Sequence, residues 1–238
     1  MSINGVQVRE ILNSMAILIN ENVDYLTELD AAIGDGDHGL NLDKGFTAVR
    51  RKLKDNDLKD IGHVLKKVGM ILVSNTGGAS GSLYGTAFIR AGITVDGKQT
   101  VDIKDFLKML EQALAGIKMR GRGRLGGKTM IDAIEPAVNA LRYSISKGLD
   151  SIHSLENVKN AAFIGVKSTE SIICKNGKAS YLGEKSIGYP DPGAVSSYLM
   201  LKAIYKKVKE LCVVEKIWFK LTNLSGGYFN GWRCNRIP

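Results

Sequence analysis

Apolar residues recur at spacings of three and four along most of this chain, and this periodicity restricts the fold more than any other feature. Such spacing places the apolar side chains on one face of an amphipathic helix. The segments that carry it are residues 8–29, 40–54, 57–72, 77–89, 102–117, 129–147, 151–174 and 194–211. Because no convincing run of alternating strand residues separates them, the sequence predicts an all-α domain of eight helices.

Two residues refine the expected helix boundaries. Asp57 precedes an apolar-periodic run, so we expect its side chain to cap the third helix. Pro136 falls inside the sixth segment, where proline either kinks a helix or marks its true first turn.

Composition narrows the setting in which the chain works. Its 238 residues are 44% hydrophobic and 24% charged, which suits a packed globular protein. No run approaches the roughly eighteen apolar residues of a membrane span, and the N-terminus lacks a basic region followed by an apolar stretch. We therefore expect a cytoplasmic protein without a membrane partner. Cys174, Cys212 and Cys234 have neither metal nor disulfide spacing, so we expect reduced thiols.

Residues 30–41, Asp-Ala-Ala-Ile-Gly-Asp-Gly-Asp-His-Gly-Leu-Asn, form the densest chemical motif of the chain. Glycines beside Asp35 and Asp37 free the backbone for turns that bring short carboxylates to one point. Converging carboxylates repel one another unless a cation lies between them, and their hard oxygens suit Mg²⁺ bridged to a phosphate. Asp-Gly pairs also form plain turns, and a lone His38 is more often a hydrogen-bonded structural histidine, so both interpretations stay open.

A second glycine cluster, residues 77–82, opens the fourth helical segment. Its small residues would let a ligand approach the backbone, and free amides at a helix N-terminus attract phosphate. The same small residues would equally permit two helices to pack closely. From these residues alone, the two interpretations carry equal weight.

A basic, glycine-rich loop spans residues 119–129. It is not a Walker A loop, because the position five before Gly127 is Arg122 and not glycine. It also lacks the interleaved aromatic residues that stack bases in RNA-binding segments. Nucleic acid is therefore the weaker partner for this loop, and the net charge of +9 also fits phosphates or an acidic protein.

Residues 213–238 differ in character from the rest of the chain. Both tryptophans, Trp218 and Trp232, fall there, and the helical periodicity ends near Phe219. We expect a helical domain over residues 1–212 and a divergent or disordered tail over residues 213–238. A docking tail is the competing interpretation.

Three motifs, in the same order, resemble those of one enzyme family. They are residues 30–39, residues 77–85 (Gly-Gly-Ala-Ser-Gly-Ser-Leu-Tyr-Gly), and residues 179–194 from Ala-Ser-Tyr-Leu-Gly-Glu to Asp-Pro-Gly-Ala. Over residues 1–210 the chain resembles the ADP-binding subunits of phosphoenolpyruvate-dependent dihydroxyacetone kinases. The resemblance implies a barrel of eight antiparallel helices that binds nucleotide in the loops at one end.

The resemblance also implies roles for individual residues. Asp30, Asp35 and Asp37 would hold two Mg²⁺ ions that bridge the phosphates of ADP or ATP. The residues implied to contact the nucleotide are His38, Gly39, Leu40 and Asn41 at the phosphates and sugar, Ala79 and Ser80 at phosphate, Gly121 and Met130 at adenine, Lys178 at the transferring phosphoryl group, and Asp191, Pro192 and Gly193 at the pocket edge.

Two positions depart from the family pattern. Lys178 stands where arginine is usual, and lysine keeps the catalytic positive charge but lacks the bidentate fork. Gly127 stands in a Gly-Gly-Lys-Thr-Met motif that usually reads Gly-Asp-Lys-Thr-Met, so we expect a looser loop on the adenine side. Neither change touches the implied Mg²⁺ ligands, so we expect activity.

The implied reaction needs two protein partners. Tightly bound ADP would accept a phosphoryl group from a phosphohistidine subunit of the phosphotransferase system and, as ATP, pass it to dihydroxyacetone on a separate kinase subunit. The chain would contribute positioning and charge neutralisation, and it should be inactive alone. A homodimer stays open. The alternatives are an ATP-exchanging triose or tetritol kinase domain, a nucleic-acid-binding helical protein, and a regulatory module that binds a transcription factor.

Overall fold

The computed structural model describes residues 1–53, 58–175 and 178–224, and it describes no side chains at residues 178–179 and 215–224. The helices are α1 (Gly5–Asn20), α2 (Val23–Ile33), α3 (His38–Lys52), α4 (Ile61–Asn75), α5 (Gly78–Thr94), α6 (Ile103–Gly121), α7 (Ile131–Ser146), α8 (Ser151–Ser168) and α9 (Pro192–Leu224). Two 3₁₀ segments, η2 (Thr169–Ser171) and η3 (Lys178–Ser186), lie between α8 and α9. The all-α prediction is confirmed.

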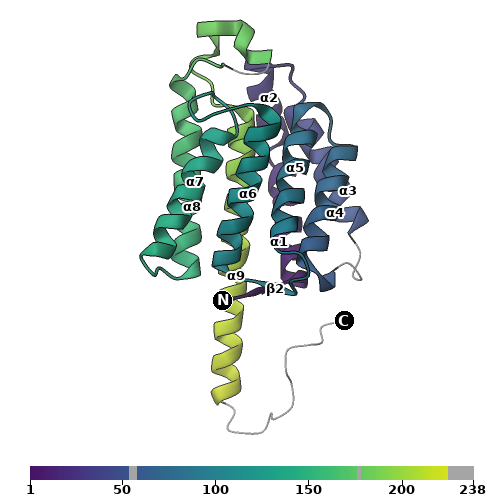
Figure 1. The fold of residues 1–238 in the computed structure, drawn as a ribbon, viewed down its shortest axis with the longest axis vertical. Coiled ribbons are helices and arrows are strands. Elements are labelled where there is room, and N and C mark those ends of the chain that lie inside the picture. Colours follow the sequence, from purple (N-terminus) through teal and green to yellow (C-terminus); the bar gives the residue numbers. More distant parts are fainter. Residues whose placement is uncertain (54–57, 176–177, 225–238) are drawn as a thin grey trace.

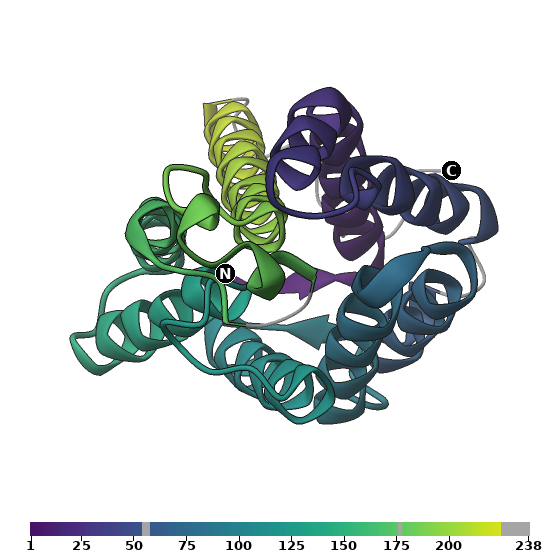
Figure 2. The ribbon, with the colours of Figure 1, turned by 90° about the horizontal axis from the view of Figure 1, so that it is seen from above.

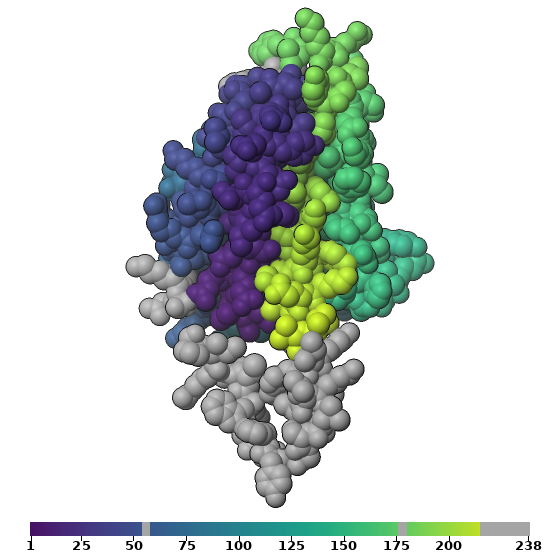
Figure 3. Space-filling view, turned by 180° about the vertical axis from the view of Figure 1, so that it is seen from behind, coloured from purple at the N-terminus to yellow at the C-terminus, as the bar shows by residue number. Residues whose placement is uncertain are grey.

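Neighbours in sequence are also neighbours in space. From α3 to α9, each helix packs against the next, and α1 contacts both α3 and α9. These contacts link α1 and α3–α9 into a closed circuit, visible from above in Figure 2, while α2 lies against α3 and α9 near one end (Figure 1). Figure 3 shows α9, in yellow, running beside α1, in purple. The apolar stripes face inward, and Leu12, Phe46, Leu72, Ile117 and Leu141 are among the fully buried side chains.

Strands β1 (Ile3–Asn4) and β2 (Thr100–Val101) pair antiparallel, with Ile3 opposite Val101. This short pair joins the start of the chain to the connection between α5 and α6. No helix in the described ranges combines the length and apolar character that crossing a bilayer requires.

Helices α4 and α5 approach closely because glycine faces glycine at two levels. A Cβ atom built on Gly69 would lie 2.6 Å from the Gly85 carbonyl oxygen, and one on Gly85 would lie 2.8 Å from that of Gly69. Gly62 and Gly92 oppose each other in the same way at 2.7 Å. A larger residue at any of these positions would push the helices apart, so this packing fixes where α5 begins.

The prediction of a single helix over residues 8–29 is wrong. α1 ends at Asn20 and α2 begins at Val23. At the break, the Asn22 side chain donates to the Leu18 carbonyl oxygen at 2.7 Å, which offers the backbone an alternative to a helical hydrogen bond. The apolar spacing continues across the break because both helices bury residues in the same core.

Other helix boundaries also shift. Asp60 caps α4, because its Oδ1 accepts from the backbone amides of His63 and Gly97, each at 3.1 Å. Asp57, the expected cap, lies outside the described residues. Pro136 lies inside α7 and does not mark its first turn. Helix α9 continues beyond the expected end near residue 211 to Leu224, and residues 225–238 lie outside the described part.

Candidate functional site

The candidate site lies at the end of the bundle where α3, α5, α7 and α9 begin (Figure 1). Because α4, α6 and α8 run the other way and end there, the connections that carry the singled-out residues share this end. Helix N-termini present free amides and a partial positive charge, and both attract phosphate. Four N-termini at one end therefore favour an anionic ligand.

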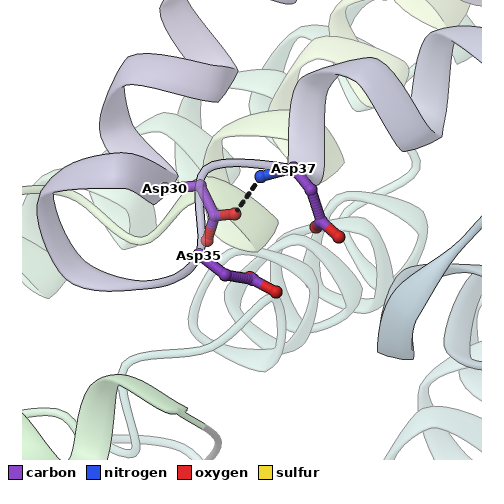
Figure 4. Close-up of side chains that lie close together, drawn as sticks. All are labelled: Asp30, Asp35 and Asp37. Carbon is purple, nitrogen blue, oxygen red and sulfur yellow. Dashed lines mark hydrogen bonds between the residues drawn. The ribbon is translucent and has the colours of Figure 1, made fainter.

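Three aspartates converge at the connection between α2 and α3 (Figure 4). One ligand oxygen of Asp30, Asp35 and Asp37 each lies within 4.8 Å of the other two. Gly36 has a φ of +73°, a conformation that side chains disfavour, and it turns the chain between two of these carboxylates. Asp30 Oδ2 accepts from the backbone amides of Asp37 at 2.9 Å and His38 at 3.1 Å, which ties the turn to the end of α2.

The chemistry of this donor set suits a hard divalent cation. Three carboxylates at this separation repel one another, and a cation among them would relieve the repulsion. Oxygen donors alone, without sulfur or imidazole, match Mg²⁺. The structure thus brings together the three aspartates that the sequence singled out, whereas the identity and number of the ions stay predictions.

His38 is buried and connects the first turns of three helices. Its Nδ1 lies 2.9 Å from Ser80 Oγ on α5, and its Nε2 lies 2.9 Å from Ser196 Oγ on α9. The Tyr84 hydroxyl lies 2.7 Å from Ser196 Oγ and 2.9 Å from Ser197 Oγ, which extends the network into the core. Burial lowers the pKa of the His38 imidazole and raises the pKa of Tyr84 to about 12. His38 is therefore a neutral, hydrogen-bonded histidine at the edge of the aspartate cluster.

The turn between α4 and α5 places backbone against α3. A Cβ atom on Gly77 would lie 2.5 Å from Asn41 Oδ1, so a larger residue there would displace the Asn41 side chain. Gly78 has a φ of +64°, and its Cβ position would lie 3.9 Å from Asp37 Oδ1. The residues predicted to contact phosphate and sugar accordingly lie on two adjacent first turns, Gly39, Leu40 and Asn41 on α3 and Ala79 and Ser80 on α5.

A buried carboxylate holds the loop between α6 and α7. Asp132 is 1% exposed, its Oδ1 accepts from the Gly126 amide at 2.5 Å, and its Oδ2 accepts from the Thr129 amide at 2.7 Å. These two bonds hold the backbone on both sides of Gly127. Whether the loop is looser than in relatives with aspartate at this position stays a prediction. Gly121 ends α6 beside this loop, and Met130 precedes α7.

Two ionic side chains join this loop to the start of α9. Lys128 is 1% exposed, and its Nζ donates to the Ser186 backbone carbonyl oxygen. Burial lowers the pKa of Lys128, and the nearby Asp191 carboxylate opposes that effect. Burial raises the pKa of the Asp191 carboxyl to about 7, although its Oδ2 accepts from the Ala194 amide at 2.7 Å. Sequence reasoning placed Asp191 at the pocket edge but missed Lys128. The glycine-rich motif that contains Lys128 was its only signal, and basic residues in such a loop are expected to be exposed.

The remaining predicted residues surround the same end. Asp191 precedes α9, and Pro192 and Gly193 begin it. A Cβ atom on Gly193 would lie 3.5 Å from Met130 Cβ, so the adenine-side residue and the pocket-edge residues adjoin. Lys178 begins η3, but its side chain falls outside the described part of the chain.

Comparisons with known proteins identify the family of this chain. The DAK2 domain model matches residues 32–206. The chain is 40% identical over 210 residues to the PEP-dependent dihydroxyacetone kinase, ADP-binding subunit DhaL, of Escherichia coli K12, which covers 88% of this chain and 100% of that protein. It is 36% identical over 190 residues to the PTS-dependent subunit DhaL of Lactococcus lactis, covering 80% of this chain and 91% of the relative.

A solved structure shares the fold. The dihydroxyacetone kinase of C. freundii in complex with AMP-PNP and Mg²⁺ matches with a TM-score of 0.65 and 25% sequence identity. The match covers 84% of this chain and 33% of that longer chain. The chain therefore belongs to the DAK2 domain family and groups with the DhaL subunits within it.

Proposed function

We propose that this chain is the ADP-binding subunit of a phosphoenolpyruvate-dependent dihydroxyacetone kinase. The observation that carries the proposal is the convergence of Asp30, Asp35 and Asp37 at the end where four helices begin. That arrangement offers a cation site directly beside the N-termini of α3 and α5, and a phosphate-bridging metal suits such a place. Similarity to DhaL subunits along most of the chain supports the same activity.

The proposal includes two Mg²⁺ ions held by the three aspartates. Bound Mg²⁺ would neutralise charge on the phosphates during phosphoryl transfer. The chain's own part is to hold the carboxylates together, through Gly36 and the two amides that bind Asp30. The AMP-PNP and Mg²⁺ bound by the C. freundii enzyme support a nucleotide and magnesium here.

The nucleotide would lie across the end of the bundle. Its phosphates would meet the first turns of α3 and α5, where His38 to Asn41, Ala79 and Ser80 lie. Its adenine would lie towards Gly121 and Met130, where a polarizable methionine suits a flat ring. Asp191, Pro192 and Gly193 would close the pocket. The closed circuit of helix contacts supports a barrel of helices with the site at one mouth.

Two partner subunits complete the proposed reaction. A phosphohistidine subunit of the phosphotransferase system would phosphorylate bound ADP, and a dihydroxyacetone-binding subunit would receive the phosphoryl group. Lys178 would supply a positive charge during transfer. A cytoplasmic location and a homodimer stay predictions from the sequence.

The test is to denature the purified protein and identify any released nucleotide by chromatography, with and without prior removal of metal by a chelator. The proposal predicts near-stoichiometric ADP that is lost on chelation. An empty protein that binds ATP reversibly would instead indicate an ATP-exchanging kinase domain. A protein that binds no nucleotide would refute the proposal, and salt-dependent binding of RNA would then favour a nucleic-acid role.

A further inference from the structure

The segment that leads into α9 is fastened from within the molecule. Lysine is almost never fully buried, yet Lys128 is 1% exposed and its Nζ donates to the backbone carbonyl oxygen of Ser186 at the end of η3. Ser186 Oγ in turn accepts from the Cys174 amide at 2.9 Å and donates to the Gly183 carbonyl oxygen at 2.7 Å. The Ser186 side chain therefore holds in place the Ser186 carbonyl group that Lys128 binds.

The backbone at Lys128 is arranged to turn this side chain inward. Its φ of +58° lies in the left-handed region, which residues other than glycine rarely adopt. Asp132 binds the amides of Gly126 and Thr129 on either side, and the Gly127 carbonyl oxygen accepts from the Lys175 amide at 3.3 Å. Since a strained conformation persists only where its surroundings impose it, the loop is built around an inward lysine.

Segment 180–188 has little apolar packing of its own to hold it. Its most exposed residue, Tyr181, is 93% exposed, and Ile187 is 44% exposed. The segment nevertheless spans the candidate site: η3 contacts α2, which carries Asp30, and the chain then reaches Asp191 at the start of α9. Figure 1 shows this segment, in green, at the upper end of the bundle. The position of segment 180–188 therefore depends on hydrogen bonds.

We propose that Lys128 is a positioning residue that fastens segment 180–188 over the nucleotide and thereby sets how slowly the nucleotide leaves. The statement about the nucleotide rests on the proposed function, whereas the fastening itself does not. Lysine suits the task because its three N–H donors sit on a stem long enough to cross the core. The Asp191 carboxylate supplies a nearby opposite charge. Methionine has a similar length and would fill the space without donating a hydrogen bond.

The test compares Lys128→Met with the unaltered protein. Hydrogen–deuterium exchange is measured for peptides that cover residues 180–190 in nucleotide-free protein, and release of a fluorescent ADP analogue with Mg²⁺ is timed separately. Arg124→Met, which removes an exposed cation from the same loop, is the matched control. Ser186→Ala weakens the same fastening with less risk to folding, and Lys128→Arg keeps a cationic donor.

We expect Lys128→Met to exchange at least roughly tenfold faster within residues 180–190, to release the analogue roughly tenfold faster, and to leave exchange in α4 and α5 unchanged. Ser186→Ala should move both rates in the same direction by less, Lys128→Arg should restore them in part, and Arg124→Met should change neither.

Unchanged local exchange in both Lys128→Met and Ser186→Ala would overturn the fastening. Faster exchange with unchanged release would overturn its control of retention. A wild-type protein that binds no nucleotide would refute the proposed function and the retention claim together, while the exchange measurement would still decide the fastening. If circular dichroism shows that Lys128→Met does not fold, hydrogen–deuterium exchange in Ser186→Ala decides whether the segment is fastened.

Discussion

Two connections at the same end of the bundle gather charged residues in opposite ways. The turn between α2 and α3 brings three carboxylates within 4.8 Å of one another. The loop between α6 and α7 buries one carboxylate, Asp132, against two amides and one ammonium, Lys128, against a carbonyl oxygen. The first connection concentrates like charge, whereas the second satisfies its charges within the chain. The difference supports the proposed cation site at the turn and a structural role for the charged groups of the loop.

The sharpest way to break the comparison is to remove a carboxylate from the turn. Asp37→Ala, or equally Asp35→Ala, should weaken Mg²⁺-dependent nucleotide binding by roughly 1,000-fold, about 4 kcal/mol, because one of three ligands is lost. Titration calorimetry with ADP and Mg²⁺ measures the affinity, and circular dichroism should show unchanged helix content. Asp24→Ala, an exposed aspartate at the start of α2, is the control. Binding that survives either cluster substitution would mean the turn is a plain turn.

The loop should respond in stability more than in ligand binding. Asp132→Ala removes a buried carboxylate and leaves the partly buried amides of Gly126 and Thr129 without their acceptor, and we expect it to lower the free energy of unfolding by about 3 kcal/mol. Urea denaturation measures the loss. Asp96→Ala, which removes an exposed ion pair with Lys66, should cost less than about 0.5 kcal/mol. Equal effects of the two substitutions would contradict the structural role of the loop.

The pKa of Asp191 predicts how the stability of the metal-free protein depends on pH. Burial raises this pKa to about 7, so between about pH 4 and pH 7 the folded protein binds a proton that the unfolded chain has lost. The free energy of unfolding should therefore fall as pH rises through this window, by about 2 kcal/mol once partial exposure is allowed for. Denaturation curves at several pH values measure the slope, and Asp191→Asn should remove it. A slope that persists in this variant would assign the effect to another group.

The smallest expected effect lies behind the turn, in the network that supports His38. Tyr84→Phe removes a buried hydroxyl that lies within hydrogen-bond distance of Ser196, Ser197 and the Gly193 carbonyl, and should lower the free energy of unfolding by about 1 kcal/mol. Nucleotide affinity should change little, because the hydroxyl is not at the aspartate cluster. Thermal denaturation measures the first effect and calorimetry the second, with exposed Tyr143→Phe as the neutral reference. A large loss of nucleotide affinity in Tyr84→Phe would mean that this network takes part in binding the nucleotide.

The helices could be predicted from sequence because each buries a periodic apolar stripe, and Asp102 was correctly expected to begin α6, which it caps. The residues at which helices end and begin were harder to predict. Asn22 interrupts the chain through a local hydrogen bond that apolar spacing does not record. Asp60 is selected as the cap of α4 partly by the Gly97 amide, a partner that only the folded chain brings near.

The candidate site likewise contains residues that local sequence could predict and residues that it could not. Asp30, Asp35 and Asp37 were predictable as a cluster because the glycines that make them converge lie among them in the sequence. The inward turn of Lys128 was not, because its partner Ser186 lies 58 residues away and loop lysines are ordinarily solvated. The pairing of His38 with Ser196 joins residues 158 apart and was likewise beyond local reasoning.

The contact of α9 with α1 has a consequence for synthesis of the protein. Because α9 leaves the ribosome after α1 and α3–α8, the circuit of helices cannot close until α9 has been synthesised. Contacts of such long sequence separation also slow folding. The aspartate turn emerges before the segment that contains Asp191, Gly193 and Ser196 at the start of α9. A nascent chain therefore holds the three aspartates proposed to bind metal well before it can assemble the rest of the site, and capture of nucleotide should follow the packing of α9.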